Sequence, residues 1–234
     1  MLGTAYRVAK ALIERRSQSN ETEVLARLTR GVPKTFVEFG FHPIEYNCIR
    51  LDDFRGLLID GNARTVRHAR WIFPRRLRVE QRFLTLENLD VIRNAFPNLW
   101  VLSIDVDGND YWFLEALLPT RPHVAAVEYN ASLGQRSITV PYDPAFDRFA
   151  KHSSGLYHGA SLAALATLCS RYGMKLVAVS ASGVNAFFVR EDHPAPALDA
   201  RGAYRECLLC NRWTGSSAVD QWERVKNLSY VEIR

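Results

Sequence analysis

The sequence predicts an α/β fold with a seven-stranded, mostly parallel sheet, one antiparallel edge strand, and helices on both faces. Short apolar runs alternate with segments of helical periodicity between residues 35 and 172, and this alternation is typical of parallel sheets. The runs are apolar at nearly every position, as expected for strands that are buried on both faces. The last two runs are joined by a short turn at Ser182-Gly183 and not by a helix, so one edge strand is expected to be antiparallel.

The composition is that of an ordinary globular protein. The chain has 234 residues, of which 47% are hydrophobic and 24% charged, and its formal net charge is +5. These values exclude a disordered or fibrous chain. No apolar run approaches the roughly 18–20 residues that a membrane span needs, and the first residues do not resemble a signal peptide. We therefore expect no membrane span and a cytoplasmic location.

Residues 1–34 are expected to form a helical segment ahead of the sheet. Residues 6–13 place their apolar side chains on one helical face, and Ser17–Asn20 interrupt this pattern. A second short helix is expected over Glu21–Arg30, and Gly31 ends it.

Seven strands and four helices are expected in the domain formed by residues 35–191. The predicted strands are short, rich in β-forming residues and bounded by glycine, proline or polar residues; they cover residues 35–40, 56–60, 77–84, 100–105, 123–129, 175–180 and 186–190. The predicted helices have apolar residues at helical spacing; they cover residues 63–72, 85–96, 111–118 and 161–172.

Two segments fall outside this alternation. Residues 130–159 form a long insertion, and a loop of that length in a compact domain is usually functional or disordered. The aromatic and aliphatic residues of the insertion favour an ordered, substrate-side element. Residues 192–234 form a C-terminal tail that contains Trp213 and Trp222. The tail is expected to pack either on the domain or on a second subunit, and the second case would make the protein a homo-oligomer.

Arginine is concentrated between Arg64 and Arg93. Such a run is typical of a solvated face, and it also suits an anionic ligand such as a nucleotide-linked or phosphorylated substrate. No aromatic-interleaved basic motif accompanies the arginines, so we expect no nucleic-acid partner.

Cys207 and Cys210 form one CxxC pair. No second pair of zinc ligands follows, so two thiols in the tail are favoured over a metal or redox site. The low cysteine count fits a reducing compartment.

Carboxylates end, or lie beside the ends of, four of the first five predicted strands; they are Glu38, Asp60, Asp105 and Glu128. Ligands of parallel sheets bind beyond the carboxyl ends of the strands. Clustered carboxylates repel one another unless a cationic or hydroxyl-bearing ligand is bound. The strand ends are therefore the predicted functional site.

Asp60 ends the second strand, directly before Gly61 and Asn62. A carboxylate at this place can accept two hydrogen bonds from a ribose diol. It can also cap the helix that follows, although Asn62 could supply that cap instead.

These motifs resemble, in their order, those of the class I S-adenosylmethionine (SAM)-dependent methyltransferases, whose fold is a Rossmann-like sheet. Glu38-Phe39-Gly40 resembles the start of that family's first motif, and Gly56–Asp60 resembles the second. Residues 102–112 resemble the fourth-strand segment of FkbM-like methyltransferases. The resemblance covers residues 35–190 and implies SAM as the cofactor, bound by Glu38, Gly40, His42, Asp60, Gly61, Thr85, Glu87, Asn88 and Asp105.

The first motif departs from the family's pattern, because His42 and Ile44 stand where the family has glycines. Glycines there let the backbone approach the cofactor closely. His42 is expected either to contact the cofactor or to start a helix, and the pocket for the methionine end of the cofactor must differ from the family's.

Residues 102–112 are also similar to the corresponding segment of caffeoyl-CoA-type, metal-dependent O-methyltransferases. That resemblance implies that Asp105 holds a divalent cation together with Glu128 and Asn130. An all-oxygen set suits Mg²⁺, Mn²⁺ or Ca²⁺. The alternative is a metal-free site, in which Asp105 positions the substrate or the cofactor and His152 or His158 serves as the base.

The resemblance implies methyl transfer to a hydroxyl of a sugar or natural-product small molecule. Asp107, Tyr142 and Asp143 are candidates for contacts with that substrate, and Asp107 also suits a loop or cap role. Two rivals stay open. One is a non-catalytic or degenerate binding module with the same fold, and the other is a different enzyme on the same sheet, such as one that modifies nucleotide sugars.

Overall fold

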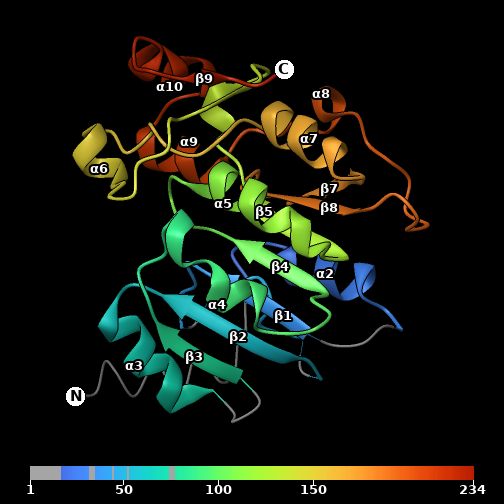
Figure 1. Ribbon diagram of the computed structural model, residues 1–234. Coiled ribbons are helices and arrows are strands. Elements are labelled where there is room, and N and C mark those ends of the chain that lie inside the picture. Colours follow the sequence, from blue (N-terminus) through green and yellow to red (C-terminus); the bar gives the residue numbers. More distant parts are fainter. Residues whose placement is uncertain (1–16, 32–34, 44, 52, 74–76) are drawn as a thin grey trace.

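The computed structural model describes residues 17–31, 35–43, 45–51, 53–73 and 77–234 (Figure 1). The helix predicted over residues 6–13 lies outside the described residues.

A seven-stranded sheet in the order β3-β2-β1-β4-β5-β8-β7 forms the centre of the described chain. The pairs on the β3 side, from β3 to β5, are all parallel. All seven predicted strands are present and the predicted fold class is confirmed; the strands are β1 (Thr35–Phe39), β2 (Arg55–Asp60), β3 (Leu77–Gln81), β4 (Val101–Ile104), β5 (Val124–Glu128), β7 (Met174–Val179) and β8 (Asn185–Arg190).

The one antiparallel strand is β8, which pairs with both β5 and β7 in the antiparallel sense. β7 and β8 form a hairpin, whose turn is closed by the Gly183 amide donating to the Ser180 carbonyl. The hairpin places β8 next to β5 and leaves β7 at the edge. The sequence predicts the antiparallel strand at the edge of the sheet, whereas in the structure it is the second strand from the edge.

Helices cover both faces of the sheet. The apolar side chains of α4 (Asp90–Arg93), α5 (Asp110–Leu117) and α7 (Leu162–Arg171) belong to the core on one face. Those of α2 (Glu21–Leu28) and α3 (Ala63–Ile72) belong to the core on the other face. Figure 1 shows α4 and α5 in front of the sheet and α2 behind it. The chain thus has the two-sided packing that continuous apolar strands require.

The helix predicted over residues 85–96 is a 3-10 turn, η1 (Leu86–Asn88), followed by the single turn α4. The Asn88 side chain accepts a hydrogen bond from the Thr85 amide and donates one to the Phe83 carbonyl. The Thr85 and Asn88 pair forms a capping box, a motif that starts helices. The helical residues after it are nevertheless only those of η1 and α4, so the expected continuous helix over residues 85–96 is wrong.

The remaining elements are short and belong to the insertion, the tail or the turn after α5. They are η2 (Leu118–Thr120), η3 (Ala131–Leu133), β6 (Ile138–Thr139), α6 (Arg148–Lys151), α8 (Ala200–Ala203), α9 (Leu208–Thr214), α10 (Ala218–Val225) and β9 (Val231–Glu232).

The tail packs against the insertion of the same chain. β6 and β9 pair as a small antiparallel sheet, and a third apolar cluster joins Leu156 and Tyr157 of the insertion to Val225 of the tail. The Tyr157 hydroxyl also donates to the Ser229 carbonyl at 2.5 Å. Figure 1 shows α6, α9 and α10 together at one end of the molecule. The insertion is ordered by these contacts.

Cys207 and Cys210 are joined in a disulfide, whereas the sequence predicts two thiols. Cys207 caps α9, so Cys210 follows it by one helical turn and the two Cα atoms are 5.2 Å apart. This separation lies within the range for disulfides. Cys48 and Cys169 are free and buried.

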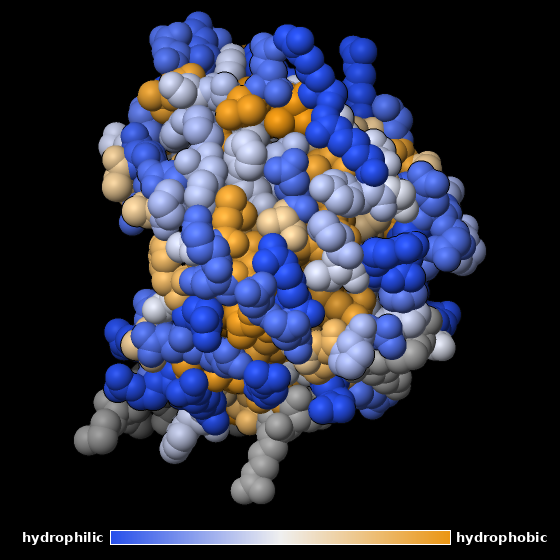
Figure 2. Space-filling view, in the orientation of Figure 1, coloured by the Kyte–Doolittle hydropathy of each residue, from blue (hydrophilic) through white to orange (hydrophobic). Residues whose placement is uncertain are grey.

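The face of the molecule in Figure 2 is mainly polar. Hydrophilic side chains cover most of it, and apolar atoms show in the gaps between them. None of the helices in the described part of the chain is long and apolar enough to cross a bilayer.

The turn after β1 crosses the turn after β4 without room for a side chain. Gly40 has a φ of +78°, and a Cβ built on it would lie 1.4 Å from the carbonyl oxygen of Asp105. Two backbone hydrogen bonds hold this crossing, from the Gly40 amide to the Ile59 carbonyl and from the Asp105 amide to the Phe39 carbonyl. Gly40 is therefore required both by its φ and by the close approach.

We expect Gly40→Ala to lower the free energy of unfolding by about 3 kcal/mol or more, because it combines a strained φ with a backbone clash. Gly173→Ala is the matched control, since Gly173 has a φ of +67° but no atom within 4 Å of the added Cβ. That control should cost only about 1 kcal/mol. Urea unfolding of both variants measures the difference, and equal losses would contradict the assigned clash.

Candidate active site

A cavity of about 530 Å³ opens at the carboxyl ends of β1, β2 and β4. The strand order reverses between β1 and β4, and ligands of open parallel sheets bind at such a switch point. The cavity size is in the usual range for small-molecule sites. Its walls come from the strand ends, the turns after them and α6; the lining residues are Phe39, Gly40, Ile59, Asp60, Gly61, Asn62, Arg82, Phe83, Leu84, Asp105, Val106, Asp107, Asn109, Phe113, Phe146, Asp147, Arg148 and Phe149.

Asp60 lines this cavity at the end of β2. One of its oxygens accepts a hydrogen bond from the Asn62 amide at 2.7 Å. The cap of α3 is the Asn62 side chain, which accepts from the amides of Arg64 and Thr65. Asp60 is therefore not needed as the helix cap, and its partial burial raises the pKa of its carboxyl.

The side chain of Glu38 is buried away from the cavity. Its two oxygens accept hydrogen bonds from the amides of Asn47 and Cys48, at 2.7 and 2.9 Å. Burial raises the pKa of Glu38 to about 7 in spite of these hydrogen bonds. The prediction that Glu38 contacts the cofactor is corrected here: Glu38 anchors the segment that follows β1.

Four other predicted cofactor residues lie outside the cavity lining. Asn88 bonds the local backbone, and Thr85 and Glu87 belong to the same turn. His42 is exposed, and its carbonyl accepts from the Glu45 amide in a tight turn. The residues that line the cavity after β3 are instead Arg82, Phe83 and Leu84. The predicted turn is therefore placed a few residues too late along the chain, because β3 ends at Gln81 and not at residue 84.

A cluster of carboxyl groups lies where β4 and β5 end. Asp105 and Asp107 line the cavity, and burial together with neighbouring carboxylates raises the pKa of Asp105 and of Glu128 well above their usual values. Asp110 is buried in the first turn of α5, where it accepts from the amides of Val106 and Gly108, both at 2.9 Å. Burial raises its pKa to about 6. Asp110 thereby fixes the turn that carries Asp107.

Arg148 brings a positive charge into this cluster from α6. Its guanidinium forms an ion pair with Asp107 and donates to the Gly155 carbonyl, and its charge lowers the pKa values of Asp105 and Glu128 in part. Arg148 was not among the predicted site residues. The signal that could have found it is the excess of acidic strand ends, which calls for a cation from the insertion.

His158 and Glu128 lie together behind Asp107. His158 Nδ1 is 3.9 Å from Glu128 Oε2, and both atoms are buried without a hydrogen-bond partner in the described part of the chain. Burial lowers the pKa of His158 well below its usual value, so its ring is neutral at pH 7. One ligand atom each from Asp107, Glu128 and His158 lie within 4.8 Å of one another.

Asn185 adds a third unpartnered polar side chain near this pair. It starts β8 and stands directly opposite Glu128 in the antiparallel register, so the two side chains share a face of the sheet. Its side-chain oxygen and nitrogen are buried and have no partner among the described residues. Buried polar atoms without partners are rare in folded proteins, and here they gather at one place beside the cavity.

Asn130 is a structural residue, which corrects its predicted role as a metal ligand. Its side-chain oxygen accepts from the Ser132 amide, and its nitrogen donates to the carbonyls of Leu156 and His158. The side chain therefore holds the backbone of His158 in place, and its oxygen is directed at the Ser132 amide. The residues that converge with Glu128 are Asp107 and His158.

The other predicted residues of the insertion have local partners. His152 Nδ1 lies 2.7 Å from the Ser154 hydroxyl and the ring does not line the cavity. The Tyr142 hydroxyl accepts from the Leu86 amide at 3.0 Å. Asp143 pairs with Lys151, and its backbone bonds the Asn109 side chain. Tyr142 and Asp143 thus attach the insertion to the domain.

No family model and no curated protein matches this chain. Two solved structures of the N-terminal domain of EvdMO1 are similar to it. The one with SAH bound has 11% sequence identity, covers 74% of this chain and 80% of its own, and has a TM-score of 0.46. The one in the presence of SAH and D-fucose has 10% identity, covers 85% and 98%, and has a TM-score of 0.47.

A TehB-like SAM-dependent methyltransferase from Corynebacterium glutamicum is also similar, with 15% identity, coverage of 81% and 97%, and a TM-score of 0.41. The fold assignment rests on the strand order and not on these similarities. Seven strands in the order β3-β2-β1-β4-β5-β8-β7, with only β8 antiparallel, form the Rossmann-like methyltransferase fold that the sequence resemblance implies. The FkbM-like subtype stays a prediction.

We expect the stability of the protein to fall as the pH rises from 4.5 to about 7, in part because of Glu38. Its folded pKa of about 7 lies above the ordinary value of 4.5, so the folded state holds this proton more tightly and loses stability as the proton leaves. With each tenfold change in proton affinity worth about 1.4 kcal/mol, this carboxyl contributes about 3 kcal/mol to the fall.

Glu38→Gln, which stays neutral, should flatten this pH dependence, whereas the exposed Glu223→Gln should leave it as in the parent protein. Chemical denaturation at pH 5, 6 and 7 measures both. An unchanged slope in Glu38→Gln would assign the pH dependence to other groups.

Proposed function

We propose that this protein is a SAM-dependent methyltransferase that methylates a hydroxyl of a small, polar, sugar-like molecule. The observation that carries the proposal is the cavity at the switch point of the sheet, with Asp60 at the end of β2 and the Gly40 backbone pressed against Asp105. A cavity between these strand ends suits a nucleoside-bearing cofactor.

The cofactor side of the cavity runs from Gly40 to Leu84. Asp60 can accept hydrogen bonds from the two ribose hydroxyls, and Phe83 and Leu84 offer apolar surface beside it for the adenine ring. Gly40 keeps the backbone of the first turn free of side-chain atoms at the cavity wall. When bound, SAM supplies a methyl group on a good leaving group, so catalysis by the protein is mostly positioning and deprotonation.

The acceptor side is the part of the cavity lined by Asp105, Asp107 and Arg148. Carboxylates accept hydrogen bonds from hydroxyls, and the guanidinium donates them. A polyhydroxylated acceptor meets both needs. Phe146 and Phe149 line the same side and can contact the apolar face of a sugar ring.

We infer that a divalent cation assists the reaction, held by Asp107, Glu128 and His158. The unpartnered atoms Glu128 Oε2 and His158 Nδ1 fit this role. Carboxylate ligands suit Mn²⁺, and the added imidazole extends the range of suitable ions to Fe²⁺ and Zn²⁺. Such a cation lowers the pKa of a bound hydroxyl. Asp107 would leave its ion pair with Arg148 and bind the cation instead.

In the metal-free alternative, His158 alone acts as the base that takes the proton from the acceptor hydroxyl. Its neutral ring has a nitrogen that can accept this proton, but burial lowers the pKa of the ring and makes it a weak base. The rival from another class is a binding module that kept the fold and lost cofactor binding. The two experiments below separate these three cases.

The first experiment is calorimetry with S-adenosylhomocysteine (SAH). We expect micromolar binding to the parent protein and at least tenfold weaker binding to Asp60→Ala, because the ribose loses its acceptor; tenfold corresponds to about 1.4 kcal/mol. Asp90→Ala is the matched control, since Asp90 is exposed, pairs with Arg93 and does not line the cavity. A parent protein that does not bind SAH would favour the binding module.

The second experiment is a titration with Mn²⁺, followed by electron paramagnetic resonance of the free ion. We expect one bound ion per chain, and at least tenfold weaker binding for Glu128→Gln and for His158→Gln, because each variant loses a ligand atom. Asp143→Asn is the control, because Asp143 already pairs with Lys151. Thermal unfolding checks that each variant is folded. Absence of Mn²⁺ binding in the parent protein would leave His158 as the base.

A further inference from the structure

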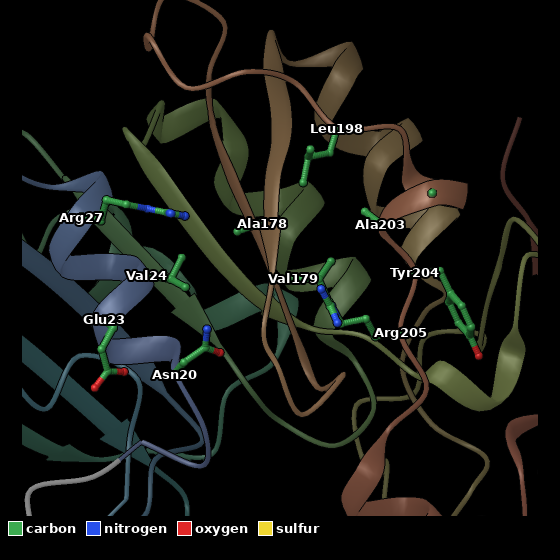
Figure 3. Close-up of a pocket in the computed structure, with 11 residues that line it drawn as sticks. Asn20, Glu23, Val24, Arg27, Ala178, Val179, Leu198, Ala203, Tyr204 and Arg205 are labelled. Atoms are coloured by element: carbon green, nitrogen blue, oxygen red, sulfur yellow. The ribbon is translucent and has the colours of Figure 1, made fainter.

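A second cavity, of about 570 Å³, lies at the β7 edge of the sheet. Its walls are α2, the end of β7 and the tail segment 198–205, and it shares no lining residue with the first cavity. Figure 3 shows Arg27 extending from α2 on one side and Arg205 beside Val179 on the other. Elements far apart in the sequence thus place two arginines around one hollow.

The guanidinium groups of Arg27 and Arg205 form no hydrogen bond or ion pair with any residue that the structure describes. The acidic residue of the lining is Glu23, which already pairs with Arg50 at an N···O distance of 3.4 Å. The cavity therefore has a net positive charge, which attracts an anion.

Further donors face the same space. The Asn20 side-chain oxygen accepts from the Ala181 amide at 2.8 Å, and Figure 3 shows the side-chain nitrogen on the cavity side. β7 is the edge strand, so one side of its backbone at Ala178 and Val179 has no neighbouring strand. Unpaired backbone groups at a sheet edge are ready to bind a ligand.

The rest of the lining is apolar. Its apolar members are Val24, Ala178, Val179, Leu198 and Ala203. A pocket that combines convergent charged groups with apolar walls is typical of a small-molecule site. The ligand therefore needs an anionic group and a short apolar body.

We propose that this cavity binds a small organic phosphate, with the phosphate between Arg27 and Arg205 and the apolar part against Val24 and Leu198. A phosphate has enough oxygens to accept from two guanidinium groups on facing walls, whereas a single carboxylate is matched to one arginine fork. The proposal does not depend on the function assigned to the first cavity.

The wall of this cavity is bonded to the corner that holds the candidate active site. The Tyr129 hydroxyl donates to the Arg205 carbonyl at 2.6 Å, and the Tyr204 hydroxyl donates to the Ala131 carbonyl at 2.7 Å. Tyr129 follows Glu128 in the chain. Asn130 lies between Tyr129 and Ala131, and its side chain donates to the His158 carbonyl. The backbone of Arg205 is thus hydrogen-bonded to the segment that follows Glu128.

The experiment is a titration of the ¹⁵N-labelled full chain with phenyl phosphate, followed by amide proton–nitrogen correlation spectra, with and without SAH. We expect saturable shifts of the amide signals of residues 20–27 and 202–205, with a dissociation constant in the millimolar range or tighter. Phenylacetate should bind at least fivefold more weakly, and benzyl alcohol should not bind. Running both arms keeps the result independent of SAH binding.

The double variant Arg27→Ala/Arg205→Ala should weaken phenyl phosphate binding at least tenfold. Both side chains are exposed and have no hydrogen bond or ion pair with a described residue, so the variant should fold. Arg93→Ala is the control, because Arg93 pairs with Asp90 and lines neither cavity. Equal binding by the double variant, shifts confined to the first cavity around Arg82 and Arg148, or absence of binding would overturn the proposal.

Discussion

The crossing of the backbone at Gly40 and Asp105 is the constraint on which the rest of the site depends. β1 and β4 are neighbours in the middle of the sheet, and the turns that follow them touch without a side chain between them. This contact fixes where Asp105 stands relative to Asp60, and the cavity lies between their turns. The cavity forms with His42 and Ile44 at the two positions where the methyltransferase motif that this segment resembles has glycines. Gly40 is required at the point of contact, because a Cβ there would meet the Asp105 carbonyl.

The second feature of the site is an imbalance of charge. The charges of Asp107 and Asp110 raise the pKa values of both Asp105 and Glu128, and the charge of Arg148 lowers them in part. Burial adds to the repulsion, because a carboxylate loses its hydration there. A cation or a hydroxyl-rich acceptor relieves both costs. His158 is neutral for another reason: the ring is buried, and the nearby Arg148 guanidinium disfavours a second positive charge.

The insertion and the tail depend on each other. The insertion brings Arg148 and His158 to the strand ends, and it is held there by Asn109 and Asn130 on the domain side and by Tyr157 on the tail side. The tail contributes β9, the third apolar cluster and Trp213, whose ring packs edge-on against Phe149 of the cavity wall. The residues after 192 therefore support the acceptor side of the site, and the segment at Arg205 also borders the second cavity.

Local periodicity, and the positions where apolar runs stop, predict the strands, most of the helices and the acidic residues at the strand ends. Asp60 and Asp105 belong to these acidic residues, and both line the cavity. Which polar side chains face the cavity and which bond the backbone depends on how distant segments pack. Glu38 lies near the end of β1 and Asn130 just after β5. The side chain of each forms its hydrogen bonds with a loop whose path no local pattern encodes. Arg148 and Asp107 are 41 residues apart, and Arg27 and Arg205 come from opposite ends of the chain. Such pairings arise from the packing of the insertion and the tail. Because this packing depends on contacts between residues far apart in the chain, the pattern of neighbouring residues does not predict it.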